Sequence, residues 1–382
     1  MNIYLNNAAT SFPKPESVYR SIDEFNRFMG GSPGRGSIQN SIEAGSVLFN
    51  AREALAEFFN IGDSSQIAFS LNVTEAINTA LKGLLRPGDH VITSSMEHNS
   101  VARPLHGMSG AGVEWTRVRC APDGSLDPND FKKEIRGNTR LICILHASNV
   151  TGTIMPIDEV SEIARDSGVL FMVDAAQTAG VLPLDVEQQG IDLLAFTGHK
   201  SMLGPQGTGG LYIRPGIEVG SLKEGGTGSS SENLEHPDFM PDHLESGTPN
   251  TPGIAGLLAG VEFIKSTGLD RIRSHEMRLT DLLVEGLREI PGVKLYGPGS
   301  GAKQTAVVSF NIEGMACSKV GQYLENLYHV VNRSGLHCSP LAHQNIGTLQ
   351  IGTCRLSPGW FNTEEEIVQT IRAVYRIARN LN

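Results

Sequence analysis

The stretch Leu193–Pro205, LLAFTGHKSMLGP, decides the fold that this sequence predicts. Its first four residues are apolar, as in a strand covered on both faces of a sheet, and a histidine and a lysine follow in a glycine-containing turn. Burial lowers the pKa of an amine and makes it a usable nucleophile or base, so Lys200 is a candidate Schiff-base lysine. The alternative is a lysine whose ammonium reaches water beside a structural histidine.

Apolar runs of the same kind alternate with helical patterns over about residues 50–215. The runs 141–145 and 169–173 are nearly continuous in hydrophobicity, and the segment PIDEVSEIARDSG between them predicts a helix that ends near Gly168. Such alternation is typical of an α/β domain with a mostly parallel sheet. Because ligands of these sheets bind beyond the carboxyl ends of the strands, we expect the functional residues there.

The remainder of the chain predicts a long loop and a smaller α+β part. Residues 222–252, rich in Gly, Ser, Glu and Pro, are interpreted as a functional or disordered loop. A helical stretch follows over about residues 253–290, with an interruption at Gly268. The sequence then predicts a strand at 306–314, a helix at 318–328, a strand-like TLQIG segment at 348–352, and a last helix that begins with a capping box of Thr363 and Glu366.

Composition and charge argue against several classes of function. The formal net charge is −10 without a dense Lys/Arg run, so we expect no nucleic-acid or membrane partner. No stretch reaches the roughly 18 apolar residues of a membrane span, and the start lacks a signal-peptide pattern, so we expect a cytoplasmic protein. The odd number of unpatterned cysteines fits a reducing compartment: Cys120, Cys143, Cys317, Cys338 and Cys354.

Polar residues follow the predicted strands. Thr74 opens a helix whose free N–H groups form an anion site, although Asn72 could simply cap that helix with Glu75 reaching back. Asp174 ends an apolar strand, where a carboxylate pairs with a cation or caps a helix. With His98 and Lys200, these groups match the phosphate, pyridine nitrogen, ring and aldehyde of pyridoxal 5′-phosphate.

The chain resembles the class V aminotransferase family of fold-type I pyridoxal-phosphate enzymes, and within it the cysteine desulfurase and selenocysteine lyase group. The resemblance runs nearly end to end through YLNNAATSFPKP, NVTEAIN, MEHNS, SNVTGT, VDAAQ, TGHKSMLGPQGTGGLY, ESGTPNTP, RSGLHC and CRLSPGWFNTEEE. It implies a large cofactor-binding α/β domain at 15–255, with a mostly parallel central sheet between helices. It also implies a small α+β domain from 1–14 and 256–382 that carries the catalytic cysteine and the substrate arginine.

The resemblance also implies the role of each cofactor residue. Lys200 would form the Schiff base with the cofactor and remove the Cα proton, His98 would stack on the ring, and Asp174 would hold the pyridine nitrogen. Thr248 would reach the phosphate in the partner's site of a homodimer. The predicted cofactor-binding set is completed by Val73, Thr74, Asn149, Gln177, Thr197 and His199.

Cys338, in RSGLHC, would select the reaction. The resemblance implies that its thiolate, made by nearby positive charge, takes sulfur from L-cysteine or L-selenocysteine as a persulfide, releases alanine and passes the sulfur to an acceptor protein. Cys338 could instead be a small buried hydrophobe, or a zinc ligand with His337 and His343, although the usual second ligand pair is missing. We predict no metal.

The substrate side is predicted to contain Arg355, Asn149 and Arg333. Arg355 would grip the substrate carboxylate with both nitrogens in one plane, and a surface salt bridge is its alternative role. Arg35, in SPGRGS, is expected to come from the partner subunit toward the mouth of the site.

Two further functions stay open at the level of the sequence. One is another enzyme of the same family, an aminotransferase, epimerase or β-lyase acting on a small amino acid. The other is a catalytically idle sulfur-relay or scaffold protein. A nicotinamide dehydrogenase is disfavoured, because no G-x-G-x-x-G motif opens a helix after an early strand.

Overall fold

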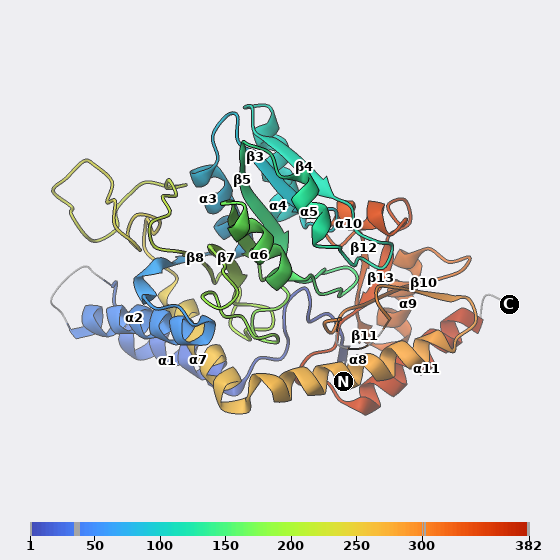
Figure 1. Cartoon of the computed structure of the whole chain (residues 1–382). Helices are drawn as coiled ribbons and strands as arrows, with labels where there is room; N and C mark the ends of the chain where they lie inside the picture. Colours follow the sequence, from blue (N-terminus) through green and yellow to red (C-terminus); the bar gives the residue numbers. More distant parts are fainter. Residues whose placement is uncertain (1, 34–38, 300, 302, 380–382) are drawn as a thin grey trace.

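A central sheet organises the larger part of the molecule (Figure 1). The computed structural model describes residues 2–33, 39–299, 301 and 303–379, so Arg35 lies outside the described residues. The strand order is β2-β8-β7-β6-β5-β3-β4, and neighbours are parallel except where β8 pairs with β2 and β7. The strands are β2 (Ile67–Ser70), β3 (His90–Ser94), β4 (Glu114–Val118), β5 (Thr139–Leu145), β6 (Leu170–Asp174), β7 (Leu193–Thr197) and β8 (Gly209–Ile213). The predicted mostly parallel α/β sheet is confirmed.

Both faces of the sheet are buried, which explains the nearly continuous apolar runs. In β7, Leu193 and Ala195 belong to one hydrophobic core, whereas Leu194 and Phe196 belong to the core on the other face. Helices α3 (Val73–Leu84) and α4 (Asn99–Ser109) cover the first face. Helix α6 (Ile157–Asp166) and the short α5 (Asn129–Glu134) lie on the second.

The close pairing of β8 with β7 requires a glycine. A Cβ at Gly210 would lie 2.4 Å from Cζ of Phe196, whose ring is fully buried and has no room to move. The GTGG sequence after the lysine turn therefore lets an antiparallel strand return against β7, with Gly209 opposite Thr197 at the end of β7.

Four helices form a layer beside this sheet, and the last of them leads into the second part of the molecule. They are α1 (Glu16–Glu24), a π-helical turn η1 (Phe25–Met29), α2 (Gln39–Phe59) and α7 (Thr251–Thr267), with a short 3-10 turn η2 (Ser64–Gln66) after α2. Figure 1 shows α7 running on into the long α8 (Leu269–Arg288), with the break at Gly268 that the sequence predicts. The predicted loop over 222–252 contains no helix or strand before Thr251.

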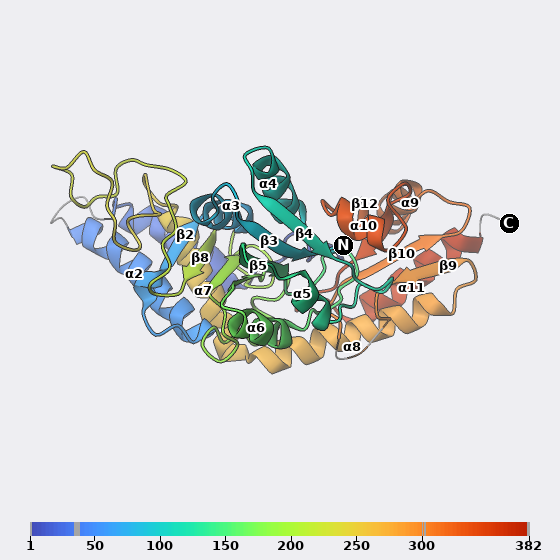
Figure 2. The same cartoon turned by 45° about the horizontal axis from the view of Figure 1, so that its top comes forward.

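The second part is a four-stranded antiparallel sheet of order β12-β13-β10-β9 with helices on it (Figure 2). Its core also contains Ile3 and Leu5, because β1 pairs in parallel with β11. Its elements are β1 (Ile3–Tyr4), β9 (Val293–Tyr296), β10 (Val308–Ile312), α9 (Cys317–Tyr328), β11 (Val330–Val331), β12 (Arg333–Gly335), α10 (Pro340–Asn345), β13 (Thr353–Leu356) and α11 (Glu364–Arg379). The domain boundaries stay a prediction, because Ile272 of α8 packs with Leu203 from the larger part.

Two local predictions for this part have different outcomes. The capping box of α11 is confirmed: Thr363 N donates to Glu366 Oε2 (3.1 Å), and Glu366 N donates to Thr363 Oγ1 (3.3 Å). The strand predicted at TLQIG is wrong, because Gly352 takes φ +64° and donates to Thr348 O (2.8 Å), which makes a turn. The strand begins one residue later, at Thr353. Among the described residues, no helix combines the length and the apolar character needed to cross a membrane.

Candidate active site

The carboxyl ends of the sheet strands open into a cavity of about 910 Å³, here called the Lys200 cavity. It lies between the large sheet and the second part of the molecule, and Ala8 and Ala9 of the N-terminal segment complete its wall. Eight of the predicted site residues line it: Val73, Thr74, His98, Asn149, His199, Lys200, Arg333 and Arg355. The fold thus collects residues that are separated by up to 282 positions in the chain, the difference between 73 and 355.

Lys200 lies in the turn after β7, and the N-terminal segment forms hydrogen bonds with the backbone of this turn. Ser11 Oγ donates to Lys200 O (2.8 Å), and Ser11 N donates to His199 O (3.0 Å). Desolvation lowers the pKa of Lys200 to about 8, although the nearby Asp174 carboxylate opposes this shift. A substantial fraction of the amine is therefore neutral near physiological pH, as a nucleophile or proton acceptor requires.

Asp174, the last residue of β6, is buried, and its Oδ1 accepts from Ala176 N (2.9 Å). Burial raises the pKa of this carboxyl group, and the Lys200 charge partly offsets the shift. Asp174 does not cap a helix, because residues 175–182 form turns. Among the described residues, the Asp174 side chain makes no hydrogen bond besides this one, so the buried carboxyl group is suited to pair with a cation.

Glu97 is a buried carboxyl group that the sequence reasoning missed. It accepts from Ser94 Oγ (2.5 Å) and from Leu145 N (3.2 Å), and burial together with the Asp174 charge raises its pKa to about 8. At neutral pH the carboxyl group of Glu97 is therefore mostly in its neutral form. Its place beside His98 in the MEHN motif was the available signal.

Two histidines of the cavity are held in the neutral form. His98 caps α4, with Nδ1 accepting from Ser100 N (3.1 Å), and desolvation followed by the Lys200 charge lowers its pKa to about 3. Desolvation lowers the pKa of His199 to about 4, and its buried Nδ1 has no hydrogen-bond partner among the described residues. A neutral ring can stack on a planar group, and a free Nδ1 is available to a ligand.

The start of α3, where the sequence predicts an anion site, lines the Lys200 cavity. The predicted N-cap is confirmed: Asn72 Oδ1 accepts from Glu75 N (3.0 Å), and Glu75 Oε2 accepts from Leu71 N (2.6 Å). Val73 and Thr74 line the Lys200 cavity at the positive end of the helix dipole. Capping and anion binding are therefore compatible roles of one helix terminus.

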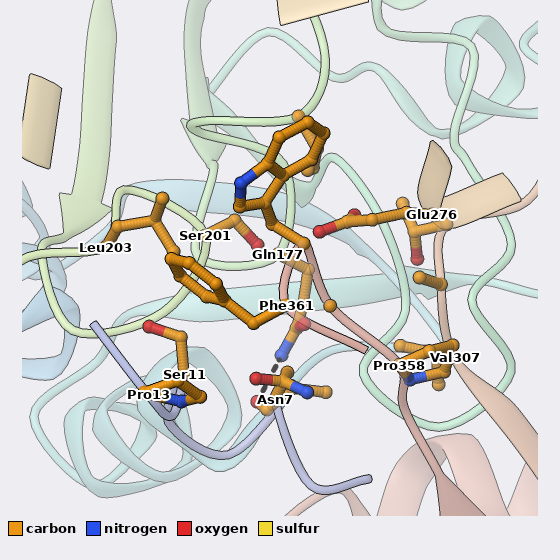
Figure 3. A pocket seen from close by; sticks show the side chains of 16 residues that line it. Asn7, Ser11, Pro13, Gln177, Ser201, Leu203, Glu276, Val307, Pro358 and Phe361 are labelled. Carbon is orange, nitrogen blue, oxygen red and sulfur yellow. Dashed lines mark hydrogen bonds between the residues drawn. The ribbon is translucent and has the colours of Figure 1, made fainter. Parts of the chain in front are cut away.

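Besides Asp174 and Cys338, three predicted site residues are not part of the lining of the Lys200 cavity: Thr197, Gln177 and Thr248. Thr197 Oγ1 donates to Thr208 O (3.4 Å) at the end of β7. Gln177 Nε2 donates to Ala8 O (3.1 Å) and lines an adjoining pocket that also contains Glu276, as Figure 3 shows. Ala8 lines both spaces, so Gln177 lies directly behind the cavity wall. The third, Thr248, lies elsewhere.

Thr248 lines a separate hollow of about 1300 Å³, here called the outer hollow. The loop that carries it is anchored by two ion pairs. Arg52 Nη2 lies 2.5 Å from Glu245 Oε2, and Lys223 Nζ lies 2.6 Å from Glu75 Oε1. Because Glu75 also belongs to the cap of α3, the loop is tied to the helix whose first turn lines the Lys200 cavity.

Arg355 projects from β13 into the cavity and is buried, so the alternative of a surface salt bridge is wrong. Its Nη1 donates to Asn149 O (2.9 Å) and its Nη2 to Asn6 Oδ1 (3.2 Å), whereas Nε has no partner among the described residues. Desolvation, with the Arg333 charge second, lowers its pKa to about 9. The group is positioned for an anion that the protein itself does not supply.

Cys338 is the one exposed cysteine of the five, so its alternative as a buried hydrophobe is wrong. Arg333 Nη2 donates to Cys338 Sγ at 3.3 Å, and Arg333 lines the Lys200 cavity. The described residues contain no group of three or more His, Cys, Asp and Glu side chains that could hold a metal ion. The thiol is therefore exposed and lies beside the cavity-lining cation Arg333, a place here called the mouth of the cavity.

The arrangement fits the predicted cofactor. The neutral imidazole of His98 can stack on a ring, and the buried carboxyl group of Asp174 can pair with a cation. The desolvated amine of Lys200 can attack an aldehyde. The orphaned Nδ1 of His199 and the first turn of α3 offer donors to a phosphate. Sequence reasoning also missed Lys14, whose pKa desolvation lowers to about 8 and whose Nζ donates to His199 O (2.9 Å).

Comparison with known proteins agrees with this geometry. The family described as "Aminotransferase class-V" matches residues 3–369. A "Probable cysteine desulfurase" of Methanothermobacter thermautotrophicus is 35% identical over 374 residues, which cover 96% of this chain and 92% of that protein.

Two solved structures are similar over nearly the whole chain. The "Apo structure of Cysteine Desulfurase from Thermococcus onnurineus NA1" has a TM-score of 0.92 at 32% identity, covering 99% of this chain and 95% of the other. The cysteine desulfurase CsdA (S-sulfonic acid) from Escherichia coli has a TM-score of 0.88 at 27% identity, covering 100% and 95%. The family match, the sequence relatives and the shared fold lead to one conclusion: the chain belongs to the aminotransferase class-V family.

Proposed function

We propose that this protein is a pyridoxal-phosphate-dependent cysteine desulfurase, which takes sulfur from L-cysteine onto Cys338 and releases L-alanine. L-selenocysteine is the second substrate to be considered. The observation that carries the proposal is the exposed thiol of Cys338, whose Sγ lies 3.3 Å from Nη2 of Arg333, a residue that lines the same cavity as Lys200. The names of the relatives support the same substrate.

The cofactor would be held by the groups that surround the cavity. Lys200 would bind its aldehyde, His98 would stack on its ring, and Asp174 would pair with its pyridine nitrogen. Its phosphate would lie against Val73, Thr74 and His199, with Thr197 close by, and Gln177 would face its ring hydroxyl. When bound, this cofactor accepts the electrons of the substrate Cα–H bond and makes the neighbouring bonds labile.

Residues of the chain would bind the substrate and move its protons. Arg355 would grip the substrate carboxylate through its free Nε and one terminal nitrogen, with Arg333 and Asn149 beside it. Lys200 would accept the Cα proton, because its depressed pKa of about 8 leaves part of the amine neutral. His98 is neutral and could carry a proton toward the substrate sulfur or Cβ.

Cys338 would carry out the step that defines the reaction. Its thiolate attacks the sulfur of the substrate, so that an S–S bond forms while the substrate C–S bond breaks. The electron pair left at Cβ takes a proton, and the product is alanine. The sulfur stays on Cys338 as a persulfide until an acceptor protein or a small thiol removes it.

A homodimer is part of the proposal. Thr248 lies in the outer hollow and not in the Lys200 cavity of its own chain, which suits a residue that serves the phosphate of a partner. Phe49 and Leu71, which are 60% and 54% exposed, line the same hollow and would be covered by a second copy. Mixing Lys200→Ala with Thr248→Val chains tests this, because only the mixed dimer would have one site with both residues native.

The function is tested by product analysis. Purified protein reconstituted with pyridoxal phosphate is incubated with L-cysteine and separately with L-selenocysteine, and all products are identified by mass spectrometry. We expect alanine from L-cysteine, and loss of this activity in Cys338→Ala. Pyruvate, an oxo acid or a D-amino acid in place of alanine would favour another enzyme of the family. Absence of any turnover would favour an idle scaffold.

A further inference from the structure

The short segment that carries Cys338 is held in a conformation that its own residues disfavour. The thiol loop, Leu336–Ser339, contains two consecutive non-glycine residues with positive φ, His337 at +49° and Cys338 at +60°. L-amino acids rarely adopt this region, so contacts from outside must impose it. The thiol loop itself supplies a single backbone hydrogen bond, from Ser339 N to Leu336 O (2.8 Å).

The outside contacts come from the segments that line the Lys200 cavity. Asn149 Nδ2 donates to His337 O at 2.7 Å, and Ser339 Oγ donates to Asn149 Oδ1 at 2.7 Å. Asn99 N, next to His98, donates to Cys338 O at 2.9 Å. The side-chain amide of Asn149 therefore binds the thiol loop on both sides of Cys338. The backbone N–H of Asn99 binds the carbonyl of Cys338 itself.

Ser339 bonds to Asn149 in place of capping the helix that it precedes. It occupies the N-cap position of α10, where a serine hydroxyl usually accepts from a helix N–H, yet it makes no such bond. Its hydroxyl donates to Asn149 instead, and the residue is fully buried. Asn149 is 8% exposed, so water competes little with either bond.

We propose that Asn149 is a positioning residue for the thiol: its side-chain amide, through His337 and Ser339, fixes Cys338 at the mouth of the Lys200 cavity. This inference rests on the proposed function, since it assigns Cys338 a reaction that depends on its placement. It adds to the cofactor and substrate contacts predicted for Asn149. The bonds to His337 and Ser339 occupy one of its two amide hydrogens and one side of its oxygen, which leaves the other hydrogen for a ligand.

Asn149 has two proposed roles, contact with the substrate and positioning of the thiol. A substitution at Ser339 distinguishes them, because Ser339 bonds to Asn149 but does not line the Lys200 cavity. If Asn149 only bound substrate, Ser339→Ala would change neither kcat nor KM. If Asn149 positions the thiol, Ser339→Ala must lower kcat while KM stays constant, because the thiol is misplaced and the substrate contacts are intact.

The test uses Asn149→Ala, Ser339→Ala and the double variant, with Ser161→Ala as the matched control. Ser161 lies on α6, far from the thiol loop in sequence. It is also buried, and its Oγ donates to Gly190 O (3.3 Å). Hydrogen exchange of the peptides that contain Asn99 and Ser339 is measured by mass spectrometry, and alanine formation is measured on the reconstituted enzyme.

We expect both single variants to accelerate exchange of the two peptides by about tenfold or more and Ser339→Ala to lower kcat by roughly 10-fold. The double variant should exchange no faster than the faster single variant, because both substitutions disrupt the same hydrogen-bonded unit of Asn149 and the thiol loop. Unchanged exchange in the single variants, or fully additive effects in the double variant, would overturn the proposal. A wild-type protein that forms no alanine would refute the proposed function instead, and exchange in the protein without cofactor would still decide whether Asn149 holds the thiol loop.

Discussion

Arg333 and Arg355 are directly paired across β12 and β13, and both line the Lys200 cavity. Two like charges on neighbouring strands destabilise a sheet unless an anion lies between or beside them. The charge of Arg333 also contributes to the lowered pKa of Arg355. The pair therefore favours binding of an anionic group, and the α-carboxylate of the proposed substrate is such a group.

The first prediction concerns Arg355→Lys. Lysine keeps the positive charge but loses the planar pair of donors, so we expect KM for L-cysteine to rise by roughly 10- to 100-fold with a smaller change in kcat. Steady-state alanine formation measures both. Arg372→Lys, an exposed arginine on α11, is the control and should leave KM unchanged. An unchanged KM in Arg355→Lys would show that the substrate carboxylate binds elsewhere.

The second prediction concerns the pH dependence of cofactor uptake by the protein without cofactor. Only the neutral amine attacks an aldehyde, and desolvation lowers the pKa of Lys200 to about 8. Below this value the neutral fraction falls about tenfold per pH unit. The rate of uptake, followed by absorbance, should rise steeply from about pH 6 and level off above about pH 8. A rate that keeps rising to about pH 10 would show an amine with an ordinary pKa.

The third prediction concerns Glu276, whose carboxylate points into the pocket beside Gln177 (Figure 3). Burial raises its pKa from 4.5 to about 8, and Arg273 partly offsets the shift. Because the folded state binds this proton more tightly than the unfolded state, the stability it contributes is complete below about pH 4.5 and is lost as the pH rises to about 8.

Glu276→Gln should therefore remove a pH-dependent loss of unfolding free energy, on the order of 3 kcal/mol between about pH 5 and pH 8. Urea denaturation at several pH values measures it. Glu285→Gln, an exposed position on the same helix, is the control and should retain the wild-type slope. An identical slope in Glu276→Gln would mean that Glu276 titrates normally.

The sequence predicted the sheet and the cavity residues because strand ends carry their own signals. Continuous apolar runs require two covered faces, and parallel strands bring their carboxyl ends to one edge, so Lys200 and Asp174 had to meet. The Asn72 cap and the break at Gly268 are likewise encoded by residues that are neighbours in the sequence. These inferences need no knowledge of distant contacts.

The remaining features depend on contacts that no local pattern encodes. Glu97 looks like an ordinary polar residue until the fold buries it against Asp174. The grip of Asn149 on the thiol loop joins positions 188 and 190 residues apart in the sequence. The TLQIG segment has strand-like composition, but the turn at Gly352 excludes it from the sheet. Tertiary context overrides propensity at such places.

The central claim is that the amine of Lys200 carries the cofactor, and reduction with borohydride followed by peptide mapping tests it most directly. Reduction would fix the cofactor to its lysine as a stable secondary amine. We predict that the label is found on the peptide containing Lys200 and is absent in Lys200→Ala. A label on Lys14, the other desolvated lysine near the cavity, or no label on any lysine, would contradict the account.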